Sequence, residues 1–237
     1  MPSSQPRDAR RVREMFGAIA RRYDFLNHLL SFNLDRRWRR RAVEELAPAP
    51  GARILDLCGG TGDLTIELAR SCEDCEVVCS DFSHAMLERA EAKLRRLRMV
   101  DRCAVVEADG LRLPYASASF DAVTVAFGVR NLADMDVGFK EMLRVLRPSG
   151  KLVVLEFSTP TAPLLAPIYR FYLHRLLPRL GDGVAGRTGP YRYLATTISE
   201  FPDPAALAGR IREAGFDAVG WATLNGGIVA LHTAIKK

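Results

Sequence analysis

The chain has 237 residues, of which 48% are hydrophobic and 26% are charged, a composition typical of a globular protein and not of a disordered chain. With 34 Lys and Arg against 28 Asp and Glu, its formal charge is +6, which favours an anionic partner such as nucleic acid or an anionic membrane surface. No apolar run approaches the roughly 20 residues that a membrane-spanning helix needs.

Residues 1–50 are predicted to be a helical segment that covers a ligand site. Apolar side chains recur at helical spacing between residues 12 and 30, before a proline-rich stretch that ends the last helix. The arginine run at 36–41 surrounds Trp38. Two interpretations of this run stay open: a solvated helix face with Trp38 packed inward, or a surface that faces an anion.

The stretch Ile54–Asp63 has the pattern of a buried strand that runs into a glycine loop. Its glycines permit a tight turn and a close backbone approach to a bulky, nucleotide-like ligand. Asp81 follows Gly62 by nineteen residues, at the end of a second apolar run, and its carboxylate can accept hydrogen bonds from both ribose hydroxyls. This pattern suits either a dinucleotide or S-adenosylmethionine.

Strands and helices alternate from residue 53 to residue 158, which predicts a parallel sheet covered by helices. Because the carboxyl ends of parallel strands meet at one edge, Asp81, Asp109-Gly110 and Phe127–Asn131 are expected to converge there. The predicted strands are 53–57, 76–80, 103–107, 120–126 and 151–155.

Residues 159–200 interrupt this alternation with five prolines and with aromatic residues and leucines interleaved with arginines. The segment is predicted to be either an amphipathic lid or membrane-surface helix, or an ordinary helical insertion. A helix over 203–215 then precedes two strands, at 216–221 and 228–234, which we expect to pair as an antiparallel hairpin at the edge of the sheet.

The cysteines are expected to be buried free thiols in a reduced, cytoplasmic environment. Their number, five, is odd, which excludes a complete disulfide framework. Cys72, Cys75 and Cys79 lie close together, but no fourth ligand follows at the spacing of a zinc finger. We therefore expect no metal site.

Six stretches make the chain resemble the menaquinone/ubiquinone biosynthesis C-methyltransferase family, within the class I S-adenosylmethionine-dependent methyltransferases. They are Met15-Phe16 through Leu26-Asn27, Gly59–Asp63, Phe127–Asn131, Leu155–Ser158, Tyr191–Leu194 and Gly227–His232. The resemblance implies an α/β, Rossmann-like fold with a mostly parallel seven-stranded sheet, an antiparallel C-terminal strand, a helical N-terminal segment and a helical insertion. It implies one domain, 1–237, with a lid at 1–50, a cofactor-binding core at 51–158 and 201–237, and the insertion at 159–200.

The resemblance also implies S-adenosylmethionine as cofactor. The implied contacts are Gly60, Thr61, Asp81 (to the ribose), Asp109, Gly110 (beside the adenine) and Ala126. Ala126 stands where the family has a serine, so only a backbone contact is expected there. Three further departures are Asn33 and Asp35, where glycine and histidine are expected, and Cys58, which replaces a common alanine or glycine.

The implied reaction is C-methylation of a reduced polyprenylated quinone precursor, foremost demethylmenaquinol to menaquinol, with benzoquinol C-methylation or RNA methylation as alternatives. Loss of a quinol proton would activate the ring carbon. We expect Arg130 to stabilise the phenolate or orient a water, Asn131 to hold the second quinol oxygen, and Tyr23 to position substrate or relay its proton. Structural roles, a core ring for Tyr23 and a helix N-cap for Asn131, stay open. Glu156, His28 and His232 are weaker candidates.

The expected partner is the polyprenylated quinol, and no nucleic acid is expected. A peripheral position at the inner membrane face and a homodimer are further candidates for a cytoplasmic protein of this kind. A nonenzymatic cofactor-binding or membrane-surface protein is the rival from another functional class.

Overall fold

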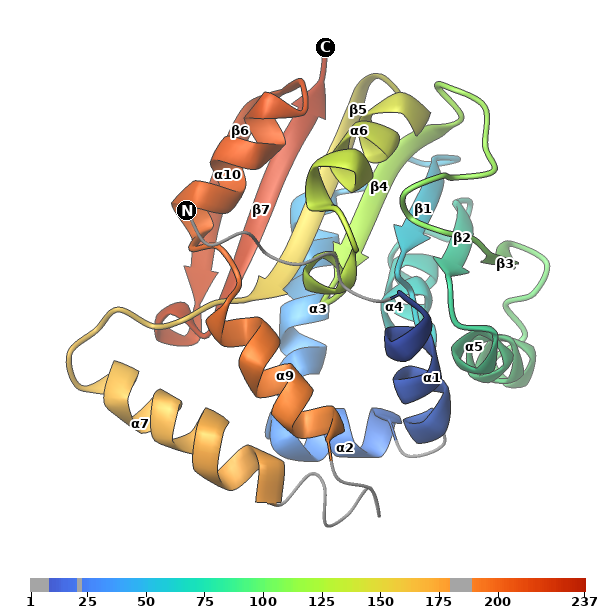
Figure 1. The fold of residues 1–237 in the computed structure, drawn as a ribbon. Coiled ribbons are helices and arrows are strands. Elements are labelled where there is room, and N and C mark those ends of the chain that lie inside the picture. The colour runs from blue at the N-terminus through green and yellow to red at the C-terminus, as the bar shows by residue number, and fades with distance from the viewer. Residues whose placement is uncertain (1–8, 21–22, 180–188) are drawn as a thin grey trace.

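The computed structural model describes residues 9–20, 23–179 and 189–237. In these ranges one sheet has the strand order β3-β2-β1-β4-β5-β7-β6 (Figure 1). Its strands are β1 Arg53–Leu57, β2 Glu76–Asp81, β3 Cys103–Glu107, β4 Phe120–Ala126, β5 Leu146–Phe157, β6 Phe216–Leu224 and β7 Val229–Lys236. Neighbouring strands from β3 to β5 are parallel, whereas β7 runs antiparallel to both β5 and β6. The predicted fold class is confirmed, and the hairpin of β6 and β7 places β6 at the edge of the sheet.

Two helical layers cover the sheet because successive strand residues point to opposite faces. Ile54 packs with α3 (Leu34–Leu46) and α4 (Asp63–Ser71). Leu55, the next residue of β1, packs on the other face with α6 (Met135–Val145) and α10 (Pro204–Glu213). Both faces of the central strands are therefore buried, which explains their nearly continuous apolar sequence.

Helix α5 (His84–Arg96) follows β2. Aspartates begin the two helices of the second layer: Asp134 accepts hydrogen bonds from the backbone N–H groups of Asp136 and Val137, and Asp203 accepts one from that of Ala206. These caps satisfy helix-end donors that have no partner within the helix.

The remaining helices form a cover beyond the carboxyl ends of the parallel strands, at the bottom of Figure 1. The cover consists of α1 Ala9–Ile19, α2 Tyr23–Leu30, α7 Leu165–Phe171, the π-helical turn η2 Tyr172–Leu176, and α9 Pro190–Ser199. Leu26, Tyr169, Leu173 and Ile198 are buried together in a separate small core there. The cover thus joins the N-terminal segment to the insertion. None of the helices in the described ranges has both the length and the apolar character needed to cross a bilayer.

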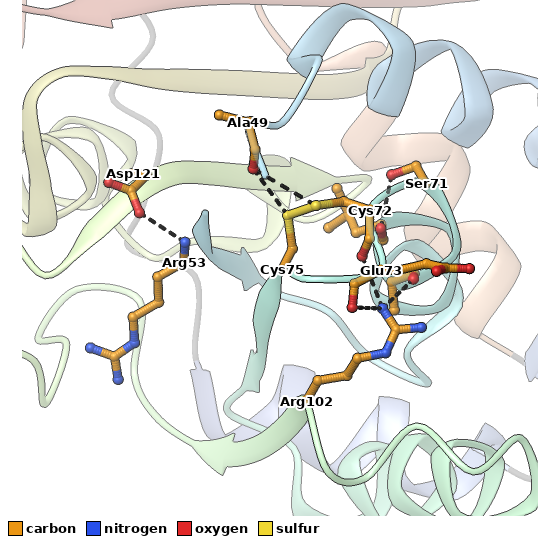
Figure 2. Close-up of a disulfide and its surroundings, with 10 residues drawn as sticks. Ala49, Arg53, Ser71, Cys72, Glu73, Cys75, Arg102 and Asp121 are labelled. Atoms are coloured by element: carbon orange, nitrogen blue, oxygen red, sulfur yellow. Dashed lines mark hydrogen bonds between the residues drawn. A yellow bond between two sulfur atoms is a disulfide. The ribbon is translucent and has the colours of Figure 1, made fainter. Parts of the chain in front are cut away.

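The expectation of free thiols was wrong for Cys72 and Cys75, which form a disulfide (Figure 2). Their Cα atoms lie 5.4 Å apart, because α4 ends at Ser71 and the chain turns at once into β2. Beside the disulfide, the Arg102 guanidinium donates to the carbonyl oxygens of Ala69, Cys72 and Glu73. The other cysteines, Cys58, Cys79 and Cys103, are free. Spacing alone could not distinguish a metal site, thiols and a disulfide.

Candidate active site

The glycine loop between β1 and α4 adopts backbone conformations that side chains disfavour. Gly60 and Gly62 have φ angles of +55° and +82°, in the left-handed region that glycine enters at little cost. A Cβ atom on Gly59 would lie 2.6 Å from the Cys79 sulfur. The loop is therefore shaped to bring its backbone, free of side chains, close to a ligand.

Asp81 anchors this loop from the end of β2. Its Oδ2 accepts a hydrogen bond from the Gly60 N–H at 3.0 Å and its Oδ1 accepts one from the Ser83 N–H at 2.9 Å. Burial raises the pKa of Asp81 to about 6, although these backbone donors oppose the shift. Since each carboxylate oxygen can accept a second hydrogen bond, the arrangement suits a vicinal diol such as the ribose of S-adenosylmethionine.

The other predicted cofactor residues lie at the ends of β3 and β4, along the same edge. The Ala108 N–H donates to the Asp81 carbonyl at 3.0 Å, which places the chain after β3 beside Asp81. Asp109 is exposed, and its Oδ1 accepts from the Leu111 N–H at 2.9 Å. Gly110 is buried against Leu132. Their contacts with adenine stay predictions.

The loops after β1 and β4 touch directly, which explains the glycine in Phe127–Asn131. A Cβ atom on Gly128 would lie 2.3 Å from the Cβ of Cys58. Cys58 and Phe127 both adopt left-handed φ angles, of 56° and 58°, a strained conformation for residues with side chains that is often found at functional sites. Ala126, the last residue of β4, precedes this turn and offers its backbone but no hydroxyl.

Arg130 is buried in the 3-10 turn that follows β4, and Glu156 of β5 is its partner. Arg130 Nη1 lies 2.6 Å from Glu156 Oε1 and donates to the Phe127 carbonyl at 2.5 Å. The guanidinium carbon lies 5.3 Å from the centre of the Phe157 ring. Arg130 Nε is buried and has no hydrogen-bond partner among the described residues. Glu156 is therefore occupied as a counter-ion, which makes it a poor candidate for the base.

Tyr23 and Arg130 line one cavity, whereas Asn131 lies behind its wall. The cavity has a volume of about 330 Å³ and contacts every helical segment of the cover. Its apolar lining includes Phe16, Ile19, Leu165, Ile168, Leu194 and Ile198. Burial raises the pKa of Tyr23, with Arg130 opposing the shift, so its hydroxyl is a neutral donor at neutral pH. Asn131 Oδ1 accepts a hydrogen bond from the lining residue Tyr193 at 3.1 Å.

A network of charges that the sequence analysis did not identify joins the cover to the glycine loop. Thr61 donates its hydroxyl proton to Asp24 of α2, so this predicted cofactor residue contacts the cover instead of standing free. Lys93 of α5 lies 2.6 Å from both Asp24 and Asp63. The cover and the glycine loop are therefore joined by partly buried polar contacts.

Arg39 lines the cavity and is the main cationic residue there that the sequence did not predict. Four arginines of the run 36–41 are exposed, whereas Arg39 is buried beside Trp38 and lies 5.5 Å from the centre of the Phe127 ring. It pairs with Asp35. Burial tends to raise the pKa of Asp35, but Arg39 holds it below its ordinary value. The helical period of the run, which puts residues 38 and 39 on the same side as Leu34 and Ala42, was the available signal.

Asp35, one of the departures from the family pattern, pairs with His28 as well as with Arg39. His28 Nδ1 lies 2.8 Å from Asp35, and His28 Nε2 lies 3.8 Å from Asp63. These three side chains have the geometry of a candidate metal site, but Arg39 and Lys93 already balance both carboxylates. The other weak candidate, His232, is buried on β7 and donates to the Pro204 carbonyl.

Asn33 has a φ angle of 59°, a conformation that glycine adopts most easily and asparagine tolerates. This departure from the family pattern therefore preserves the backbone. It leaves the turn between α2 and α3 intact.

Two known methyltransferases are similar to this chain over nearly its whole length. A demethylmenaquinone methyltransferase of Mycobacterium sp. (strain KMS) is 49% identical over 225 residues, 95% of this chain and 94% of that protein. The ubiquinone/menaquinone biosynthesis C-methyltransferase UbiE of Pectobacterium carotovorum subsp. carotovorum (strain PC1) is 42% identical over 226 residues, 95% of this chain and 90% of that protein.

Solved structures show the same fold at low sequence identity. A S-adenosylmethionine-dependent methyltransferase from Aquifex aeolicus aligns with a TM-score of 0.63 and 16% identity over 84% of this chain and 89% of its own. The [4+2]-cyclase SpnF aligns with a TM-score of 0.67 and 19% identity over 85% of this chain and 80% of its own, so the fold alone does not define the reaction. The family model described as the ubiE/COQ5 methyltransferase family matches residues 4–236. The chain belongs to the ubiE/COQ5 methyltransferase family.

Proposed function

We propose that this methyltransferase transfers the methyl group of S-adenosylmethionine to a ring carbon of demethylmenaquinol and so forms menaquinol. The observation that carries the proposal is the apolar cavity of about 330 Å³, which has Arg130 and Tyr23 in its wall. An aromatic ring with an apolar substituent suits this lining, and the two polar groups suit its hydroxyls. The names of the relatives favour this substrate class over RNA.

The residues at the strand ends fit S-adenosylmethionine, which supplies an electrophilic methyl group on its sulfonium. Asp81 would accept hydrogen bonds from the ribose, and the Gly60 region would approach the cofactor with its backbone. Ala126 would contribute only backbone. Asp109 and Gly110 would lie beside the adenine. In this arrangement the polar edge of the sheet binds the cofactor and the cover binds the acceptor.

The chain's contribution to the chemistry is to orient the acceptor and stabilise its charge. An aromatic carbon becomes nucleophilic when the neighbouring hydroxyl loses its proton. Arg130 stays protonated and is no base, but its unpaired Nε–H can bind the phenolate oxygen or orient the water that takes the proton. Glu156 holds the guanidinium in place, and Tyr23 donates to a substrate oxygen. Asn131, held by Tyr193, would support the second quinol oxygen from behind the cavity wall.

A benzoquinol is the alternative acceptor, because the relative at 42% identity carries both ubiquinone and menaquinone in its name. The proposal is tested by incubating the protein with labelled S-adenosylmethionine and one acceptor at a time. The acceptors are a naphthoquinol, a benzoquinol, the oxidised quinone of each, and RNA. We expect label only in reduced substrates, and more in the naphthoquinol, since an oxidised ring has no hydroxyl to deprotonate. Equal labelling with and without reductant would contradict the mechanism, and labelled RNA would contradict the substrate class.

Two further parts of the proposal concern the setting of the enzyme. A protein that acts on a polyprenylated quinol is expected to work at the inner face of a membrane, as a peripheral protein on the cytoplasmic side. A homodimer is the proposed assembly. Analytical ultracentrifugation of the purified protein checks the assembly, and a monomer at all concentrations would contradict it.

A further inference from the structure

Large apolar side chains are exposed together on two segments of the cover. We call them the apolar face: Phe25, Leu29 and Phe32 on α2 and the turn after it, and Leu164, Ile168, Phe171 and Leu176 on and beside α7 and η2. These are seven of the 11 large apolar residues exposed in the described ranges, so the exposure is concentrated. Such a patch marks an interaction surface more often than a scattering of single residues does.

The two segments of the apolar face lie side by side. The Phe32 and Tyr172 ring centres are 6.5 Å apart, and the Tyr172 hydroxyl donates to the Leu30 carbonyl at 2.6 Å. Leu164, Ile168 and Phe171 follow one another at helical spacing, so they form a single stripe along α7. Figure 1 shows α2 and α7 at the same end of the molecule, beyond the sheet.

The charges around the apolar face are mainly basic, and the one acid of α2, Asp24, is paired with Lys93. Residues 159–179 contain no Asp or Glu, and their arginines, 170, 175 and 179, are exposed. At the start of α3, the exposed arginines 36, 37 and 40 surround a single acid, Asp35, which is buried and paired with Arg39. Apolar residues beside an excess of exposed arginines are the composition of a segment that lies on an anionic bilayer, where basic residues near the surface add to the binding.

The cavity opens on the apolar face. Phe32 is 77% exposed and Ile168 is 66% exposed, and both also line the cavity, so these two side chains form its mouth. About 330 Å³ is near the lower end of the roughly 300 to 1,000 Å³ of small-molecule sites, which leaves room for a ring and the start of a tail. The rest of a long apolar tail must leave through this mouth, and exposing its CH₂ groups to water would be unfavourable.

We propose that the enzyme docks on an anionic lipid bilayer through the apolar face, with the surrounding arginines at the level of the lipid phosphates, and admits the substrate ring from the bilayer through the mouth between Phe32 and Ile168. The tail then remains largely in lipid while the ring reaches Arg130. The route of the tail rests on the proposed function, whereas the docking does not.

Vesicle sedimentation tests the docking on the full chain. The variant Phe25→Glu/Phe171→Glu changes two exposed residues of the apolar face that do not line the cavity. Its matched control is Val100→Glu/Val137→Glu, which changes exposed apolar residues on other elements. We expect the wild type and the control to bind vesicles that contain phosphatidylglycerol, more weakly at high salt, and the apolar-face variant to bind at least about tenfold more weakly.

Equal vesicle binding by the two variants would overturn the proposal, as would a wild type that ignores anionic vesicles. A wild type that dimerises through this face and binds no vesicles would also overturn it, because a second copy would then be the occupant. Turnover separates docking from chemistry: with a short-tailed quinol in solution the apolar-face variant should match the wild type, and with a long-tailed quinol in vesicles it should be at least about tenfold slower. If the wild type and both variants bound vesicles as expected but none transferred a methyl group, only the proposed function would be overturned.

Discussion

The two sides of the site are built in opposite ways. On the cofactor side, short segments at the ends of β1 and β2 place backbone N–H groups about 3.0 Å from the Asp81 carboxylate. On the acceptor side, helices α1, α2, α3, α7 and α9 enclose a largely apolar cavity. In the proposed function, directed polar contacts select one cofactor, whereas apolar packing accepts a ring with a variable tail. The difference predicts that single polar substitutions abolish cofactor binding while changes in the cover alter substrate use gradually.

Substituting Asp81 should produce the largest effect. Asp81→Ala would remove the two proposed ribose hydrogen bonds to a charged acceptor, and at about 1.5 to 3 kcal/mol each the cofactor affinity should fall by more than about a hundredfold. Calorimetric titration with S-adenosylmethionine measures it. Asp109→Ala is the control, since Asp109 is exposed, and it should weaken binding only severalfold. A wild-type affinity for Asp81→Ala would remove Asp81 from the cofactor side.

Arg130 lies at the boundary between the two sides, so its effect should fall on turnover alone. Arg130→Lys keeps a charge for Glu156 but loses the planar donors, and we expect turnover to fall about a hundredfold while cofactor affinity stays nearly unchanged. Arg144→Lys, which alters an arginine paired with Glu141 at 2.8 Å, is the control.

The melting temperature of the Arg130→Lys variant tests the alternative, in which Arg130 has only a structural role. Breaking a buried ion pair can cost about 3 to 5 kcal/mol of unfolding free energy. If Arg130 were only structural, Arg130→Lys would lose thermal stability and cofactor affinity together. Unchanged turnover would exclude it from the mechanism.

Acid should weaken cofactor binding, because the pKa of Asp81 is raised to about 6 by burial. A group with that pKa is only about one-tenth ionised at pH 5, so affinity should fall about tenfold between pH 7 and pH 5. The contribution of Asp81 to stability has the opposite sign: its folded pKa lies above the ordinary value, so the folded state gains stability as pH falls through 6. Titrations with the cofactor at pH 7 and pH 5 measure this change in affinity, and Asp81→Asn should remove it. If the affinity of the Asn variant still depended on pH, another group would be responsible.

Filling the cavity should have a smaller effect and spare the cofactor. Leu194 lines the cavity and is half-buried, so Leu194→Trp intrudes on the acceptor at an expected cost of about 1 kcal/mol. The KM for a long-tailed quinol should rise about fivefold, with the cofactor affinity unchanged. Leu194→Met, which nearly conserves volume, is the matched variant. Equal losses of cofactor and acceptor binding would show that the two sides are not separable.

The disulfide should matter least for activity. Cys72 and Cys75 precede β2, at the edge of the sheet opposite the site. Their bond closes a very short loop, so reduction should cost about 2 kcal/mol and lower the melting temperature by about 4 to 8 °C. Turnover of Cys72→Ser/Cys75→Ser and of the wild type on the same fully reduced quinol, together with calorimetric scans, checks both statements. A loss of activity at a temperature where the variant is folded would contradict the separation.

Much of the fold follows from local sequence. Apolar runs of strand length, separated by helical patterns, determined β1 to β4 to within one residue, and glycines marked the turn where the cofactor side begins. The six predicted cofactor residues lie at strand ends or in the loops that follow them, because parallel strands share one carboxyl edge. These features depend on side-chain periodicity and on backbone conformations that only some residues adopt, and both are readable within a short window.

Only the tertiary structure decided what the remaining polar and apolar groups do. Trp38 donates to Asn225, 187 residues away, and Arg130 pairs with Glu156 from another strand. The disulfide, the inward turn of Arg39 and the contact of α2 with η2 beside the cavity depend likewise on contacts between distant segments. A sequence pattern states which face of a helix is apolar but not what covers it, because the free energy of burial depends on the partner that packing supplies.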